Sequence, residues 1–76
     1  MDEVTIFLRT ALFTFDGPEA HLPVGVSAIE GVVTEEAKGG LVVTTSRLLD
    51  HRGRELATKE LKLHLPWGKV DHLLLT

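Results

Sequence analysis

The fold is decided by residues 60–66, Glu60-Leu61-Lys62-Leu63-His64-Leu65-Pro66. Leucines at every second position alternate with polar side chains, which is the period of a strand with one buried and one solvated face. Pro66 has no backbone N–H to donate, so the strand is predicted to end there. After a short turn, residues 71–75 (Asp71-His72-Leu73-Leu74-Leu75) predict a final strand.

Residues 40–49 predict another strand, because they are rich in β-branched side chains. Glycines at 39 and 40 indicate a turn before it, where a residue can take positive φ. The segment 50–53, Asp50-His51-Arg52-Gly53, indicates a hairpin turn that contains a left-handed residue. Two tight turns therefore bracket a long central strand.

Two further segments show interrupted alternation. In residues 24–37 the apolar phase is even at Val24 and Val26 but odd at Ile29, which predicts a bulge or bend near Gly31. Residues 3–15 fit either a helix with an apolar stripe or a strand with a phase slip near Arg9. We predict the strand, because β-branched and aromatic residues dominate the segment; the helix remains the alternative.

Residues 65–73, Leu65-Pro66-Trp67-Gly68-Lys69-Val70-Asp71-His72-Leu73, give a strand, one tight turn and a short closing strand. With a long bent strand, a Gly-Gly tip and a third strand before it, this layout resembles the small SH3-like β-barrels, including Sm-like and PRC-type domains. In those families a short 3-10 turn joins the last two strands, and residues 66–70 resemble that turn. The resemblance covers about residues 24–75. It implies that residues 1–76 form a single all-β domain, a small five-stranded SH3-like barrel.

A chain of 76 residues forms one domain with a small core of its own. It has no cysteine, which excludes disulfides and thiolate metal sites, so we expect a partner subunit to add stability. The absence of Cys, Asn and Gln follows a trend of heat-adapted proteins, and indicates a thermophilic or GC-rich bacterial source. The acidic start and the lack of a long apolar stretch predict a cytoplasmic protein with no membrane contact.

No catalytic, metal or cofactor site is predicted. The four histidines, His21, His51, His64 and His72, do not stand at zinc-ligand spacing with another ligand. The two serines do not lie on a strand-turn-helix elbow, and the glycine pair leads into a strand rather than into a phosphate-binding helix. We therefore expect that the chain is not an enzyme.

Candidate contact residues cluster in the C-terminal half of the chain. They are Arg47, Arg52, Arg54, Lys62, Trp67 and Lys69. A loop tryptophan is typical of an interface anchor or a barrel plug, and cations with an aromatic platform are typical of single-strand binding. The net charge of −3 opposes nucleic acid. We predict a non-enzymatic interaction domain that self-associates or binds a protein through strand edges or an apolar patch near Trp67 and residues 73–75. The alternative is an Sm-like RNA or single-stranded nucleic-acid binding protein.

Overall fold

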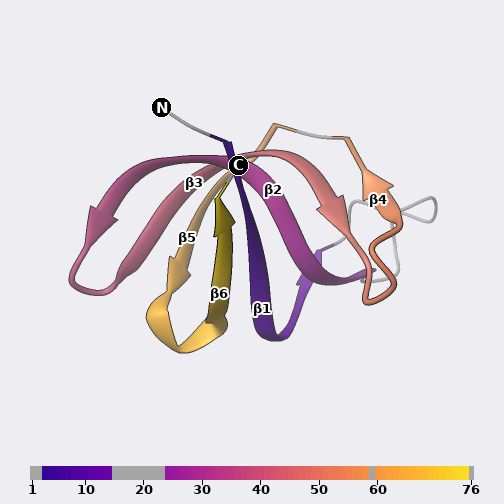
Figure 1. The fold of residues 1–76 in the computed structure, drawn as a ribbon, viewed down its shortest axis with the longest axis horizontal. Helices are drawn as coiled ribbons and strands as arrows, with labels where there is room; N and C mark the ends of the chain where they lie inside the picture. The colour runs from indigo at the N-terminus through magenta and orange to yellow at the C-terminus, as the bar shows by residue number, and fades with distance from the viewer. Residues whose placement is uncertain (1–2, 15–23, 59, 76) are drawn as a thin grey trace.

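Six strands and one short 3-10 helix make up most of the described chain (Figure 1). The structure, a computed structural model, describes residues 3–14, 24–58 and 60–75. The strands are β1 (Glu3–Thr14), β2 (Val24–Ala37), β3 (Gly40–Leu49), β4 (Glu55–Ala57), β5 (Lys62–Pro66) and β6 (Val70–Leu75), and the 3-10 helix η1 (Trp67–Lys69) joins the last two. The predictions of an all-β fold and of a tight turn before the final strand are confirmed.

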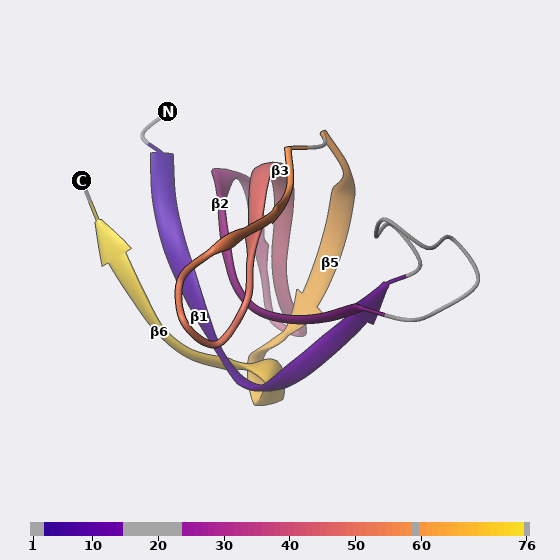
Figure 2. The same ribbon diagram turned by 90° about the vertical axis from the view of Figure 1, so that its right-hand side faces the viewer.

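All six strands belong to one antiparallel sheet, which stays open. Its order is β4-β3-β2-β1-β6, and β5 pairs with the first half of β3. Among the described residues no pairing joins β5 to β6, so the sheet is not the closed five-stranded barrel of the prediction. The two strands diverge from η1, as Figure 2 shows. The additional strand is β4, whose three residues are too few to leave a periodic pattern in the sequence.

The N-terminal segment is strand β1, which excludes the helical alternative over Glu3–Thr14; residue 15 lies outside the described residues. Its first half pairs with both β2 and β6. Between Phe7 and Leu12 the register with β2 shifts, because β1 has several residues where β2 has only Ser27. The strand turns sharply at this point (Figure 2), which confirms the predicted phase slip near Arg9.

Strand β2 bends where the alternation of buried and exposed side chains along it is interrupted. Val26 and Ile29 both belong to the buried core although an odd number of positions separates them. The register with β3 then shifts immediately before Gly31. A Cβ atom on Gly31 would lie 2.4 Å from the carbonyl oxygen of Thr44, so β2 and β3 come this close only because residue 31 is glycine. The predicted bend near Gly31 is confirmed.

Strand β3 divides its outer edge between two partners. Gly40–Thr44 pair with β5, and the last two residues of β3 pair with β4. Gly40 has a φ of 153°, and a Cβ there would lie 2.0 Å from the carbonyl oxygen of Leu65, so this approach also requires glycine. At the other end of β3, Gly53 takes a φ of 79°, as the predicted hairpin turn requires.

The core lies on one face of the curved sheet. Its buried members come from every strand except β4, and Leu56 of β4 packs against them; they are Val4, Ile6, Val26, Ile29, Leu41, Val43, Leu48, Leu65 and Val70. Leu65 is buried and Leu61 and Leu63 are half-buried, while their polar neighbours in the sequence are exposed, which confirms the alternation in residues 60–65. Each fully buried aliphatic side chain contributes about 1.5–3 kcal/mol to folding.

Candidate functional site

The six predicted contact residues do not form one surface. Arg47 lies near the end of β3, and Arg52 and Arg54 lie in the turn that follows. Lys62 begins β5, and Trp67 and Lys69 belong to η1. Figure 1 places η1 below β5 and β6, whereas the turn between β3 and β4 lies toward the other end of the long axis. The structure therefore separates the aromatic candidate from the arginine group.

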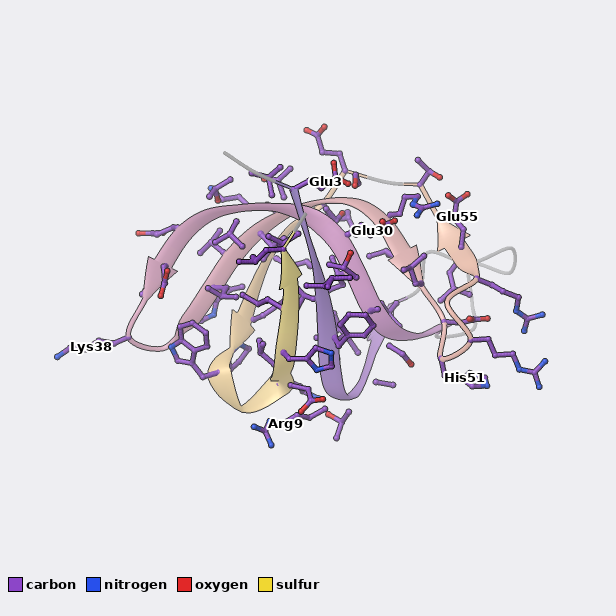
Figure 3. All side chains as sticks on the ribbon, viewed as in Figure 1. Glu3, Arg9, Glu30, Lys38, His51 and Glu55 are labelled. Atoms are coloured by element: carbon purple, nitrogen blue, oxygen red, sulfur yellow. The ribbon has the colours of Figure 1, made fainter. Side chains whose placement is uncertain are left out.

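Two of the candidate cations, Arg47 and Arg54, form ion pairs with acidic side chains. Arg47 pairs with Glu30 of β2 and lies 3.5 Å from a carboxylate oxygen of Glu55. Figure 3 shows that Glu30 and Glu55 come from neighbouring parts of the sheet. The hydrogen bond that the Arg47 guanidinium donates to Glu30, followed by the negative charge of Glu30, raises the pKa of Arg47. The two carboxylates offset the positive charge of this guanidinium and compete with a phosphate for its N–H donors.

Arg54 belongs to a turn that is organised by Asp50. The Asp50 carboxylate accepts hydrogen bonds from the backbone N–H groups of Arg52 (2.8 Å) and Arg54 (2.9 Å), and from the Arg54 Nε at 3.1 Å. These donors, the Arg54 N–H first, lower the pKa of Asp50. Within the described chain the side chains of Arg52 and Lys62 are exposed and have no acidic partner.

Trp67 is exposed, and its indole N–H is already hydrogen-bonded within the protein. Its side chain is 41% exposed and outside the core, so it is not a plug of the core. The indole Nε1 donates to the carbonyl oxygen of Ala37 at 3.1 Å, and the backbone N–H donates to that of Gly39 at 3.3 Å. Trp67 thus ties η1 to the tip of the β2–β3 hairpin and leaves much of its ring in solvent.

Among residues 3–14, 24–58 and 60–75, the other exposed large apolar side chains lie on the C-terminal strand. The structure leaves Leu73 36%, Leu74 54% and Leu75 71% exposed. All three lie on β6, which stands at one end of the strand order and, within the part of the chain that the structure describes, pairs with β1 alone. Trp67 lies on η1, before this six-residue strand begins, and Leu75 is the last residue of the strand. The expected patch is therefore two features, an exposed indole on η1 and an apolar edge strand.

Contacts with β1 hold β6 in place. The ring of His72 stacks on that of Phe7 with centroids 4.5 Å apart, and its Nδ1 lies 3.0 Å from the Asp71 carboxylate. The Arg9 Nε donates to the carbonyl oxygen of Val70 at 3.1 Å. The Lys69 Nζ donates to the Thr10 hydroxyl at 2.9 Å, so this predicted contact residue fastens η1 to β1.

The histidines of the described residues, which could act as metal ligands or as acids and bases, lie on separate elements. His51, His64 and His72 are exposed on a turn, on β5 and on β6, respectively; His21 lies outside the described residues. No group of three His, Asp or Glu side chains among residues 3–14, 24–58 and 60–75 could hold a metal ion. The same ranges contain no helix long and apolar enough to span a bilayer.

The stack of Phe7 on His72 and the pairing of Glu30 with Arg47 were not predicted from the sequence. Both join residues far apart in the chain, so local patterns carried no signal for them. The alternation of Phe7 with buried neighbours would have placed it on the face opposite the core. Comparisons of the chain with protein-family models, with curated proteins and with solved structures find no match. The case for a function rests on the geometry of the sheet.

Proposed function

We propose that this chain is a non-enzymatic interaction domain whose docking surface is the free edge of β6. The observation that carries the proposal is the position of Leu73, Leu74 and Leu75. These exposed leucines occupy consecutive positions on β6, the strand at one end of the sheet order. An edge strand presents unpaired N–H and C=O groups, and it is a template for strand addition when it is apolar and unprotected.

The cross-strand register shows which face each leucine extends. Leu73 lies opposite Ile6, and Leu75 lies opposite Val4. Directly opposed residues project from the same face, so both leucines continue the face that holds the core. Both are nevertheless exposed, so the described residues leave part of the apolar core face uncovered at this edge. A partner strand beside β6 would bury this apolar surface.

The layout also supports an SH3-like fold that is open between its last two strands. Its supports are the strongly bent β2, the 3-10 turn before the last strand and the pairing of β6 with β1. In this proposal the opening between β5 and β6 leaves two edges free, and β6 is the apolar one. The proposal assigns the binding of a polypeptide, and no reaction, to this domain.

Photo-crosslinking in cells of the source organism tests the function. The full chain carries p-benzoyl-phenylalanine in place of Leu74, and a matched control carries it in place of His64, which is exposed on another edge strand, β5. We expect polypeptide adducts from position 74 and few from position 64. Equal adducts from both positions, or none from position 74, would contradict a docking surface on β6.

A further inference from the structure

The three outer strands of the sheet differ in how well their edges are protected. Strand β4 has only three residues. Strand β5 carries Lys62 and His64 on its exposed face and ends in Pro66, which cannot donate to a neighbouring strand. Short length, lysine and proline are the devices that keep edges from pairing. Strand β6 has none of them between His72 and Leu75.

Contacts with β1 also hold strand β6 in the extended conformation that a pairing strand needs. The stack of His72 on Phe7 and the hydrogen bond from Arg9 to the Val70 carbonyl fix it to β1. The register shift between Phe7 and Leu8 leaves Asp71 unmatched on β6, so the single acidic residue of the strand sits at a bulge. Beyond that bulge, the four residues 72–75 pair regularly with β1.

We infer that the occupant of this edge is β6 of a second copy of the chain, paired antiparallel about a two-fold axis at Leu73. This inference rests on the proposed function and deepens it by naming the partner. The axis stands perpendicular to the sheet, so each Leu73 lies opposite the other and each Leu74 lies opposite His72 of the second copy. The two sheets then join into one continuous antiparallel sheet.

Charge favours this arrangement over two other pairings of β6 with itself. In the proposed register the two Asp71 residues lie about 14 Å apart along the strands, beyond the screening length at physiological salt. A parallel pairing would set the Asp71 side chains directly side by side, and an axis at His72 would oppose the two imidazoles. Pairing of β6 with β5 of another copy would place β6 against Pro66, which has no backbone N–H to donate.

The interface is small, so the association is weak. A single pair of six-residue strands buries less than the roughly 1,200 Å² of a standard interface. We therefore expect dimers at concentrations from tens of micromolar upward and monomers when the protein is dilute. Sedimentation velocity from about 1 μM to 1 mM covers this range.

Single cysteines test the register, because the chain contains none of its own. Residues directly opposite each other are within disulfide reach, whereas diagonal neighbours about 7–8 Å apart are not. Under mild oxidation we expect Leu73→Cys to form a covalent dimer about tenfold faster than Leu74→Cys or His64→Cys. A faster reaction at position 74, or a mixed dimer between Leu73→Cys and His64→Cys as the main product, overturns the proposed pairing.

Lysine variants test the surface without cysteine. Leu74→Lys brings two like charges within about 8 Å across the axis, so we expect the dimer to weaken at least about tenfold. His64→Lys places the same charge on β5 and leaves the dimer unchanged. Unchanged far-ultraviolet circular dichroism in both variants shows that the monomer is folded. Equal effects of the two variants overturn the inference.

The failures of the two proposals are distinguishable. A wild-type protein that stays monomeric to 1 mM while position 74 still crosslinks to another polypeptide in cells overturns the self-pairing and keeps the interaction domain. Absence of crosslinks from position 74 together with a monomer at every concentration overturns both.

Discussion

Replacement of Gly31 by alanine tests the close crossing of β2 over β3. The new Cβ would lie 2.4 Å from the carbonyl oxygen of Thr44 and 2.9 Å from the Cα of Thr45, and both atoms belong to the backbone of the neighbouring strand. No rotamer change relieves such a contact, so one strand has to move by about 1 Å to reach an ordinary carbon–oxygen separation. Residue 31 is also buried, which leaves no room outside the sheet.

The expected cost follows from two opposing contributions. Overpacking of a tight site costs about 1–3 kcal/mol, and the backbone collision puts Gly31→Ala at the upper end of that range. Loss of glycine from the unfolded chain gives back about 0.4–1 kcal/mol. The free energy of unfolding should therefore fall by about 2 kcal/mol, which lowers the Tm by about 10 °C for a domain of this size.

Urea unfolding measures this change, with the single tryptophan, Trp67, as the fluorescent probe. Its indole is hydrogen-bonded to Ala37 at the tip of the β2–β3 hairpin, so its emission reports on this part of the sheet. Gly68→Ala is the matched control, because a Cβ there meets nothing within 4 Å. A Gly31→Ala protein as stable as the Gly68→Ala control would refute the close crossing of the two strands.

Three further outcomes are expected. Thr45→Val removes the hydroxyl that accepts the Leu61 N–H at 3.0 Å in a buried setting, so it should lower the free energy of unfolding by about 1–3 kcal/mol in urea, while Thr45→Ser should cost less. Asp50 has a depressed pKa in the folded protein, so the stability it contributes is complete above its unfolded pKa of about 3.9 and is lost as the pH falls through the folded value. The urea midpoint of the wild type should therefore drop in acid, and the midpoint of Asp50→Asn should drop less. Equal drops in the two proteins would exclude the Asp50 turn as the cause. Oligonucleotide anisotropy at low salt should show no binding, because Arg47 and Arg54 are paired with carboxylates; binding that Arg52→Ser weakens would reverse this assignment.

Much of the strand layout could be predicted because it depends on local patterns. The alternation of Leu61, Leu63 and Leu65 gave the face of β5, and the glycine pair gave the start of β3. The change of apolar phase between Val26 and Ile29 predicted the bend in β2. In each case the signal lies within a few residues of the feature, so periodicity and turn chemistry are sufficient.

The openness of the sheet and the state of the candidate site depend on distant contacts. Whether β5 pairs with β6 is decided by the direction in which both leave η1, and no local pattern encodes that direction. Arg47 looked available for a ligand in the sequence, but Glu30 of the neighbouring strand neutralises it. The sequence left Trp67 as either a barrel plug or an interface anchor, and its exposure excludes a plug of the core.

The most direct test of the docking edge is an NMR dilution series of the uniformly ¹⁵N-labelled wild-type protein, followed through its backbone amide signals. We predict concentration-dependent shifts confined to residues 72–75 and to their partners on β1, with slower amide exchange in β6 at high concentration. Amide signals of β5 and of the turn at Asp50 should not move. Shifts centred on β5, or amide exchange in β6 that is fast and independent of concentration, would contradict the assignment of β6 as the edge that pairs.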